Sequence, residues 1–253
     1  MNLSGNTILI TGGGSGIGRG LAEALHANGN TVIIAGRRKA LLEETADANP
    51  GMKFLVIDIE TAGAIRALAV RLASEFPALN VLINNAGIMR PEDLLAQQDD
   101  LSDAEAIVTT NLLGPIRLTA ALLPLLRKQE QSTIINVSSG LAFVPMAMTP
   151  TYCATKAAIH SYTQSLRYQL KGTATEVLEI IPPYVQTDLM GGAEDPRAMP
   201  LKDYIAETME LLGTQPTPAE ICVKNVYPLR FAERDGKFDV VFTGFNDAMS
   251  GGH

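Results

Sequence analysis

The sequence is short of the residues that nucleic-acid and metal sites require. Its 253 residues contain 20 lysines and arginines against 27 aspartates and glutamates, so the formal net charge is −7. No basic stripe is available to neutralise phosphates, and we expect no nucleic-acid partner. The two cysteines, Cys153 and Cys222, and the three scattered histidines lack the spacing of a metal-ligand set, so we expect no metal.

Segments that direct a chain into or across a membrane are also lacking. Residues 1–6 are short and largely polar, with no charged-then-apolar signal segment. No run of eighteen apolar residues occurs, so we expect no membrane partner. Two cysteines without a pairing pattern are typical of reduced thiols. These absences predict a cytoplasmic protein.

Short apolar runs alternate with helix-length segments along the chain. The runs that predict buried strands are Thr7–Thr11, Thr31–Ala35, Lys53–Asp58, Val81–Ile83, Thr133–Val137, Glu176–Ile181 and Glu220–Val223. The helical segments between them favour parallel pairing. Because no composition shift marks a linker, we predict a single α/β domain over residues 1–253, a doubly wound parallel sheet (Rossmann fold).

A glycine-rich turn follows the first predicted strand and opens the first predicted helix. It contains Gly12, Gly14, Ser15, Gly16, Ile17 and Gly18. Glycines at such a turn let backbone N–H groups approach a pyrophosphate and let the helix pack closely on the strand. The turn therefore predicts a dinucleotide site, and a turn with only a structural role is the alternative.

The second predicted strand ends in two arginines, Arg37 and Arg38, and no carboxylate occurs before Glu43. An acidic residue at this place usually holds the ribose hydroxyls of NAD, whereas an arginine accommodates the 2′-phosphate of NADP. We predict a preference for NADP(H) and leave NAD(H) open. Asp58, which ends the third strand, suits either an adenine amino group or the N-cap of the next helix.

Two polar features precede the fifth strand. Asn84-Asn85-Ala86-Gly87 follows the fourth strand and suits hydrogen bonding to a ribose, with a plain turn as the alternative. A long helix is expected over Ala104–Arg127, with Pro115 as a kink or local break. A proline cannot donate to the carbonyl four residues earlier, so the Asn111 carbonyl is free to hold a water.

Tyr152 and Lys156 lie four residues apart on a predicted helix and therefore share one face. A neighbouring ammonium favours the phenolate, so we expect a lowered Tyr152 pKa and a phenol that exchanges protons near neutral pH. The spacing alone is common in exposed amphipathic helices. How strongly this spacing indicates a catalytic pair depends on the motifs that precede it in the sequence.

In this order, the motifs resemble the short-chain dehydrogenase/reductase family. They are Thr11-Gly12-x3-Gly16-x-Gly18, Asn84-Asn85-Ala86-Gly87, Asn111, Ser139, Tyr152-x3-Lys156 and Pro182-x2-Val185-x-Thr187, within roughly Thr7 to Leu212. Ser139 stands thirteen residues before Tyr152, the separation that the family uses. Residues 161–170 and 181–189 resemble a bacterial subgroup, the DltE-type oxidoreductases.

The resemblance implies a role for each site residue. Tyr152 would exchange a proton with the substrate oxygen, Lys156 would hold the nicotinamide ribose, and Ser139 would orient the substrate. Asn111 would anchor a water that relays protons to Lys156. The implied cofactor-binding residues are Gly12, Gly14, Ser15, Gly16, Ile17, Gly18, Arg37, Arg38, Asp58, Ile59, Asn84, Ala86, Gly87, Tyr152, Lys156, Pro182, Val185 and Thr187. The implied substrate-binding residues are Ser139, Leu141, Tyr184 and Met190.

The sequence departs from the family pattern at two places. Pro183 stands where the family usually has glycine. The C-terminal tail, residues 224–253, lacks the strand and Val-Asp-Gly-Gly ending that pack a family tetramer, and instead predicts helices at Pro228–Arg234 and from Phe238 onward. We therefore expect a homodimer through the Asn111 and Tyr152 helices, with a tetramer as the alternative.

A substrate lid is expected over about residues 188–212, where a loop rich in Gly, Met and Pro precedes a helix. Met190, Met199, Leu141, Phe143, Met146, Met148 and Tyr184 suggest an apolar pocket, and ordinary loop packing is the alternative. Together the features predict an NADP(H)-dependent oxidoreductase acting on a small, largely apolar ketone, aldehyde or secondary alcohol. The alternatives are a non-catalytic NADP-binding sensor or scaffold and a methyltransferase, which would not explain Tyr152 and Lys156.

Overall fold

A computed structural model describes residues 1–96 and 100–250, apart from the side chains of Met190, Ala193 and Ser250. Seven strands form one parallel sheet in the order β3-β2-β1-β4-β5-β6-β7. They are β1 (Thr7–Thr11), β2 (Thr31–Gly36), β3 (Lys53–Val56), β4 (Leu79–Asn84), β5 (Ser132–Val137), β6 (Thr175–Ile181) and β7 (Glu220–Cys222). All seven predicted strands are confirmed, as is the doubly wound Rossmann arrangement.

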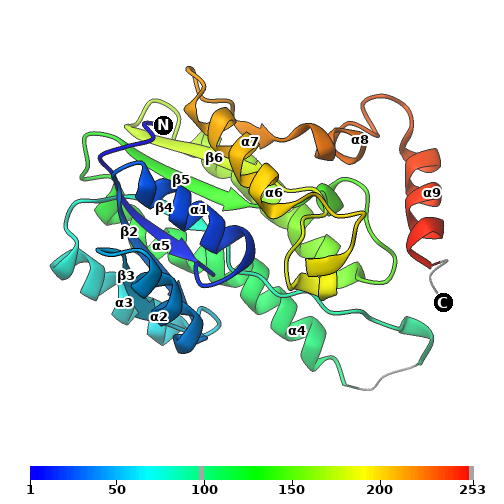
Figure 1. The fold of residues 1–253 in the computed structure, drawn as a ribbon, viewed down its shortest axis with the longest axis horizontal. Helices are drawn as coiled ribbons and strands as arrows, with labels where there is room; N and C mark the ends of the chain where they lie inside the picture. Colours follow the sequence, from blue (N-terminus) through cyan, green and yellow to red (C-terminus); the bar gives the residue numbers. More distant parts are fainter. Residues whose placement is uncertain (97–99, 251–253) are drawn as a thin grey trace.

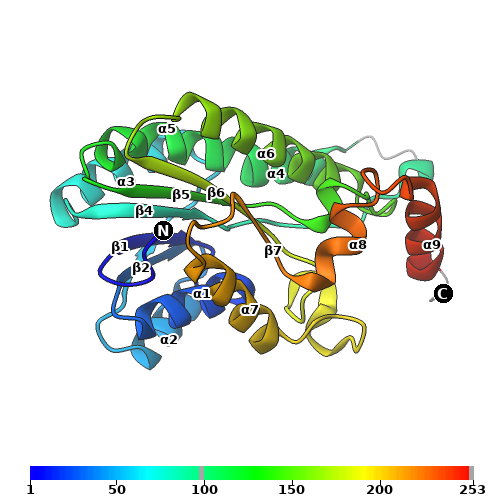
Figure 2. The ribbon, with the colours of Figure 1, turned by 90° about the horizontal axis from the view of Figure 1, so that it is seen from above.

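Helices cover both faces of the sheet (Figures 1 and 2). One face carries α1 (Gly16–Ala27), α2 (Lys39–Ala48) and α7 (Leu201–Gly213). The other carries α3 (Ala62–Glu75), α4 (Ser102–Val108), α5 (Gly114–Leu126) and α6 (Pro150–Gln169). Because each central strand is buried on both sides, its sequence is apolar throughout rather than alternating.

Two buried clusters follow from this layering. Ile8 and Ile10 of β1 pack with Leu21 and Leu25 of α1 on one face. Leu9, between those isoleucines, packs into the cluster on the opposite face. Each fully buried aliphatic side chain contributes about 1.5–3 kcal/mol, so this double core holds the carboxyl ends of the strands in fixed register.

A π-helical turn, Thr109–Leu113, separates α4 from α5 and has Asn111 at its centre. The sequence predicted one helix with a kink or local break at Pro115. The structure has its irregular turn at Thr109–Leu113, directly before the helix that contains this proline. Pro115 lies in the first turn of α5 and has no N–H to donate to the Asn111 carbonyl, which is the physical reason for a wider turn here.

The helical stretch Ser102–Leu126, which includes α4, this turn and α5, could cross a membrane by its length and composition alone. Of its most apolar window, 44% is buried inside the fold. The helix packs against α3, β4 and β5, so it is a core helix of the α/β domain.

The C-terminal tail adds two helices, α8 (Tyr227–Arg230) and α9 (Phe238–Ser250), as the sequence predicted. The first is shorter than the expected Pro228–Arg234. Both views place α9 at one end of the molecule, beyond the carboxyl ends of β5 and β6 (Figures 1 and 2).

Candidate active site

A cavity of about 820 Å³ opens at the carboxyl ends of the strands. The predicted site residues that line it are Gly12, Gly14, Ser15, Gly16, Ile17, Gly18, Arg37, Arg38, Asp58, Ile59, Ala86, Gly87, Ser139, Leu141, Tyr152, Lys156, Pro182, Tyr184, Val185 and Thr187. Parallel strands bring their carboxyl ends to one edge of the sheet, and ligands bind there in open α/β folds.

The glycine turn leaves room for a ligand against its backbone. Gly12 and Gly16 have positive φ angles of 69° and 53°, which favour glycine. A Cβ on Gly18 would lie 2.3 Å from the Gly12 carbonyl oxygen and 2.4 Å from Asn85 Nδ2. Since α1 begins at Gly16, its first N–H groups lie at the cavity, an arrangement that suits a pyrophosphate.

Asn85 ties β4 to this turn. Its side-chain Nδ2 donates to the Thr11 carbonyl at 2.9 Å. The backbone N–H groups of Asn85 and Ala86 both donate to Thr11 Oγ1 at 3.1 Å. These contacts hold the β4 end beside the glycines.

The implied contact of Asn84 with the cofactor is not supported by the structure. Its side chain is buried below the site, where Nδ2 donates to Asn136 Oδ1 at 2.8 Å and to Thr119 Oγ1 at 3.2 Å. Asn85, the first residue after β4, lines the cavity in its place.

The two arginines after β2 have different partners. Arg37 Nη1 pairs with Glu60 Oε1 at 2.9 Å, and the Thr110 hydroxyl donates to the same oxygen at 2.7 Å. Arg38 Nη2 donates to the neutral Ser15 hydroxyl at 2.5 Å. Arg38 therefore keeps an uncompensated charge beside the glycine turn, whereas the charge of Arg37 is partly neutralised.

Asp58 lines the cavity and its Oδ1 accepts from the Glu60 N–H at 3.0 Å. The N-cap of α3 is Thr61, so the N-cap alternative for Asp58 is wrong. The carboxylate instead fixes the turn after β3 and leaves its second oxygen for a ligand.

Ser139, Tyr152 and Lys156 come together on one wall of the cavity, and each is less than 10% exposed. Ser139 follows β5, and its Oγ accepts from the Leu141 N–H at 3.1 Å. Tyr152 and Lys156 lie one turn apart on α6. Lys156 Nζ donates to the Val137 carbonyl at 2.9 Å and lies 5.5 Å from the centre of the Tyr152 ring.

Burial governs the titration of both groups. It raises the pKa of Tyr152 well above the usual phenol value, although a hydrogen bond with Ser139 acts in the opposite direction. Burial also lowers the pKa of Lys156 to about 8, against the attraction of Glu179. The expected lowering of the Tyr152 pKa is therefore wrong for this arrangement, because desolvation disfavours the phenolate more than the Ser139 hydrogen bond favours it.

Asn111 lies behind the cavity wall and is only 1% exposed. Its Oδ1 accepts from the Ile88 N–H and its Nδ2 donates to the Ile88 carbonyl, both at 2.8 Å. A Cβ on Gly87 would lie 3.3 Å from Asn111 Oδ1 and 3.7 Å from Lys156 Nζ. The side chain thus positions the Gly87–Ile88 backbone, and the water relay implied for its carbonyl stays a prediction.

The end of the cavity away from the arginines is apolar. Leu141, Met146, Met148 and Tyr184 line it as predicted. Pro183, the departure from the family pattern, also lines the cavity. The side chain of Met190 lies outside the described part of the structure. Residues that sequence reasoning missed here are Ile88, Met89, Leu229, Phe245 and Met249.

Phe143 and Met199 do not line the cavity. Phe143 packs edge-on against His160, with ring centres 4.7 Å apart, and lies under the Arg230 guanidinium. Met199 packs against the core on the α1 side, and its N–H donates to the Tyr184 carbonyl at 2.9 Å. For these two residues, ordinary packing is the observed role.

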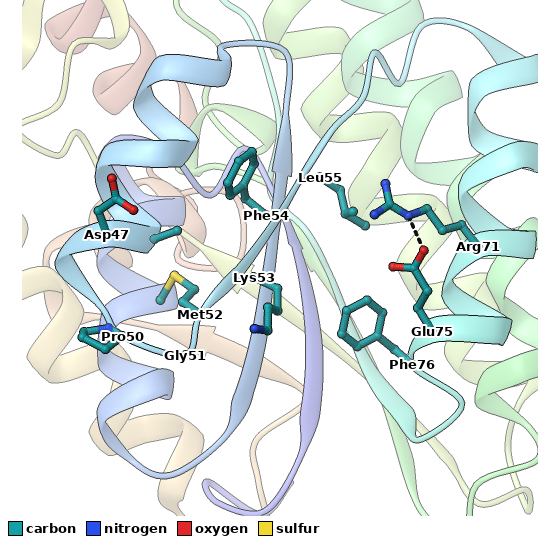
Figure 3. Close-up of a pocket in the computed structure, with 11 residues that line it drawn as sticks. Asp47, Pro50, Gly51, Met52, Lys53, Phe54, Leu55, Arg71, Glu75 and Phe76 are labelled. Atoms are coloured by element: carbon teal, nitrogen blue, oxygen red, sulfur yellow. Dashed lines mark hydrogen bonds and ion pairs between the residues drawn. The ribbon is translucent and has the colours of Figure 1, made fainter.

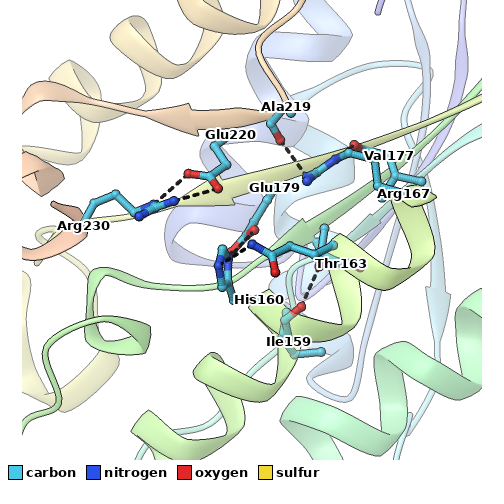
Figure 4. A network of polar contacts seen from close by, with 11 residues as sticks. Ile159, His160, Thr163, Arg167, Val177, Glu179, Ala219, Glu220 and Arg230 are labelled. Atoms are coloured by element: carbon cyan, nitrogen blue, oxygen red, sulfur yellow. Dashed lines mark hydrogen bonds and ion pairs between the residues drawn. The ribbon is translucent and has the colours of Figure 1, made fainter. Parts of the chain in front are cut away.

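One group of ligand-type side chains gathers among the described residues: His160, Glu179 and Glu220 (Figure 4). His160 Nδ1 lies 2.8 Å from Glu179 Oε2, and Arg230 forms a two-pronged ion pair with Glu220 at 2.7 and 2.9 Å. Because both carboxylates already have partners, we assign the group a structural role that joins α6, β6 and β7.

A second cavity, of about 510 Å³, lies between α2, β3 and α3 at the sheet edge (Figure 3). Its wall includes Lys53, Met52 and an ion pair between Arg71 and Glu75 at 2.7 Å. No predicted site residue lines it, so the functional site lies in the larger cavity.

The family described as short chain dehydrogenase matches this chain over residues 6–198. The uncharacterized oxidoreductase DltE of Bacillus subtilis (strain 168) is 38% identical over 249 residues, which cover 97% of this chain and 98% of that protein. This agrees with the resemblance carried by residues 161–170 and 181–189.

Solved structures agree with the family match. A short chain dehydrogenase from Burkholderia cenocepacia J2315 in complex with NADP is 26% identical, with a TM-score of 0.79 over 94% of this chain and 96% of that chain. A 3-ketoacyl-(acyl-carrier-protein) reductase from Brucella melitensis complexed with NADH is 27% identical, with a TM-score of 0.77 over 85% of this chain and 93% of that chain.

Proposed function

The chain belongs to the short-chain dehydrogenase family and is an oxidoreductase, and from this premise we propose that it interconverts a carbonyl compound and an alcohol with NADP(H). The substrate is a small, largely apolar ketone or aldehyde, or the corresponding secondary alcohol. The observation that carries the proposal is the buried group of Ser139, Tyr152 and Lys156 on the wall of a cavity that also holds the glycine turn.

The side chains can perform the proton half of this reaction. A reduced nicotinamide supplies the hydride when it is bound. The Ser139 hydroxyl orients the substrate oxygen, and Tyr152 donates its proton to that oxygen to complete the alcohol. The raised pKa of Tyr152 keeps its phenol protonated at neutral pH, as a proton donor requires. The Lys156 ammonium holds the cofactor ribose and stabilises the phenolate that remains.

The preference for NADP(H) rests on charge at the end of β2. Arg38 lies beside Ser15 of the glycine turn, and Arg37 stands next to it at the cavity wall. No carboxylate follows β2 directly to hold ribose hydroxyls. The Burkholderia relative was solved with NADP and the Brucella relative with NADH, so the family accepts both and local charge decides.

We also propose that the loop at residues 188–200, the first part of the expected segment 188–212, is a lid; the second part is α7, which packs against α1 with Tyr204 and Leu212 in the core. Asp188, Leu189 and Gly191 line the cavity, and the Tyr184 hydroxyl donates to Asp195 Oδ2 at 3.1 Å. Arg197 pairs with the same carboxylate at 2.7 Å, which holds the pKa of Asp195 well below its usual range. These contacts tie the lid loop to the segment after β6.

A homodimer through α5 and α6 fits the exposed surface of α6. Ala154, Ala157, Ser161 and Ser165 fall on one exposed face, and small residues let two helices approach closely. The partly exposed apolar stretch Ser102–Leu126 lies beside it. Both cysteines are free and buried, which supports the proposed cytoplasmic location.

The test is a panel of ketones, aldehydes and secondary alcohols with NADPH and NADH, followed by the loss or gain of reduced nicotinamide. We expect turnover of apolar carbonyls and its loss in Tyr152→Phe by a factor of about 10² to 10⁴, with NADPH binding retained. Thermal-shift titration measures that binding. Unchanged turnover in Tyr152→Phe would contradict the mechanism, and NADPH binding without turnover of any compound would favour the sensor alternative.

A further inference from the structure

The C-terminal helix α9 forms part of the active-site cavity. Phe245 and Met249 line the cavity and pack against the cluster that contains Tyr152, Met146 and Ile107. They belong to the C-terminal helix, and no sequence motif predicted that they line the active-site cavity. The helix therefore lies beside the proposed proton donor, within reach of a substituent of the substrate carbonyl.

The side chain of Asn246 ties α9 to the loop before α6. Asn246 Oδ1 accepts from the Ala147 N–H at 2.7 Å. Its Nδ2 donates to the Pro145 carbonyl at 3.1 Å and to the Phe242 carbonyl at 2.9 Å. The amide thus joins the helix to the loop before α6 through both of its ends, and it orients the neighbouring Phe245 and Met249 toward the cavity.

Charge is distributed unevenly along the cavity. The cofactor end carries Arg37, Arg38 and Asp58, whereas the wall beside α9 is made of methionines and Phe245. Asp195 and Arg197 also line the cavity and are paired with each other, and Arg197 Nη1 donates to the Met249 sulfur at 4.0 Å. Against Phe245 and the methionines a charged substituent would lose hydration, and it would have to compete with Asp195 for Arg197, while a hydrocarbon chain would gain burial.

We propose that α9 and the loop before α6 form a binding subsite for an uncharged hydrocarbon tail on the carbonyl substrate. Phe245 and Met249 are its specificity-determining residues, and Asn246 is the positioning residue. This inference rests on the proposed carbonyl chemistry and adds the substrate class, a carbonyl compound with an extended apolar chain. Methionine side chains adapt to ligands of different shape, so we expect the subsite to select for the length of the hydrocarbon tail rather than for its branching.

The first test uses methyl ketones from butanone to nonanone with NADPH. We expect kcat/KM to rise about three- to fourfold for each methylene that α9 buries. In Phe245→Ala and Met249→Ala this increment, taken as the ratio of kcat/KM between successive ketones of the same variant, falls toward one. The matched control is Val240→Ala, because Val240 is 78% exposed on the same helix and does not line the cavity. An increment that survives both cavity-side substitutions overturns the proposal.

Asn246 is tested by the same series. Asn246→Ala should lower the ratio of kcat/KM for nonanone to kcat/KM for butanone and keep NADPH affinity. Asn246→Asp, which keeps an acceptor for the Ala147 N–H, should retain part of the increment. Equal losses for butanone and nonanone would mean that Asn246 only stabilises the fold, and would remove its positioning role.

A second readout does not depend on turnover. The chain has no tryptophan, so F245W carries a single reporter on α9. Octanone should change its emission in the presence of NADPH, whereas V240W should not respond. If the wild type reduces no ketone but F245W responds, the carbonyl chemistry fails and the apolar subsite stands. If F245W does not respond while ketones are reduced, the subsite is wrong and the proposed function stands.

Discussion

Tyr152 and Lys156 show how one physical cause acts on two side chains in opposite directions. Each residue is about 95% buried, and loss of water disfavours the charged form of each. The phenol pKa rises and the ammonium pKa falls to about 8. Near neutral pH the phenol keeps its proton and the amine is still mostly charged. This combination suits carbonyl reduction more than alcohol oxidation.

Lys156 should leave a pH signature in stability. Its pKa is about 8 in the folded chain against an ordinary 10.5, so the unfolded chain binds more protons in that window. The free energy of unfolding of the wild type should therefore rise, relative to Lys156→Met, between pH 8 and 10.5 by roughly 3 kcal/mol at most. Urea unfolding of both proteins across this range measures the difference. Parallel curves would show that burial does not shift this pKa.

Arg38 should contribute more to NADPH affinity than Arg37. Arg37 is partly neutralised by Glu60, whereas Arg38 donates to a neutral hydroxyl. A hydrogen bond to a charged group contributes about 1.5–3 kcal/mol, so Arg38→Ala should weaken NADPH binding roughly ten- to hundredfold, with a smaller effect for Arg37→Ala. NADH binding should change little. Titration of both cofactors measures this.

Lys39 supplies the matched control for these arginines. It is the next basic residue, pairs with Glu43 on α2 and does not line the cavity. Lys39→Ala should leave both affinities unchanged. An equal loss of NADPH and NADH affinity in Arg38→Ala would remove the argument for a 2′-phosphate site.

At the scale of the element, α6 carries the proposed catalytic residues and is anchored to the sheet on its inner side. Tyr152 and Lys156 face the cavity, and His160, one turn further, pairs with Glu179 of β6 (Figure 4). Glu179 is fully buried, and its charge acts on Lys156. The pair thus anchors the helix to the sheet and supplies a negative charge behind the catalytic ammonium.

Glu179→Gln should therefore move the pH dependence of reduction. The carboxylate raises the pKa of Lys156, so its removal lets the amine lose its proton at a lower pH. If activity requires the ammonium, the alkaline fall in kcat/KM should shift to lower pH than in the wild type. A pH profile with butanone measures this. Glu220→Gln is the control, because that carboxylate belongs to the same group but pairs with Arg230. A profile that does not move in folded Glu179→Gln would contradict the link.

At the scale of the whole molecule, the cavity gathers parts from both ends of the chain. The glycine turn comes from the first βα unit, the proposed proton donor from α6, and part of the apolar wall from α9. Of these three parts, only α9 lies outside the residues 6–198 that match the family, and Leu229 of α8, which also lines the cavity, lies outside them too. We therefore expect the tail to separate this protein from relatives in substrate range while the proton chemistry stays common.

The proposed homodimer can be tested by the mass in solution. Ala157→Arg places a long charged side chain on the exposed small-residue face of α6, so the mass from light scattering should fall from two chains to one. Ala206→Arg is the control, because Ala206 is exposed on α7, on the opposite face of the sheet. A monomeric wild type, or a dimer that survives Ala157→Arg, would contradict an interface on α6.

Local patterns determined much of this protein. The apolar β-branched runs predicted every strand, because a strand buried on both faces has to be apolar throughout. The glycine turn and the Tyr152–Lys156 spacing were readable for the same reason, since both depend on residues within one or two turns of each other. Pro115 likewise located the break at Asn111, because a missing N–H acts four residues away.

The tertiary structure decided what depends on distant packing. It buried the Asn84 side chain in the sheet core and placed Asn85 at the cavity. It raised the Tyr152 pKa by enclosing the phenol, and it placed Phe143 under the Arg230 guanidinium rather than in the cavity. It also brought Phe245 and Met249 to the substrate end of the site. Burial and cavity shape are sums over many remote neighbours, so no short stretch of sequence contains them.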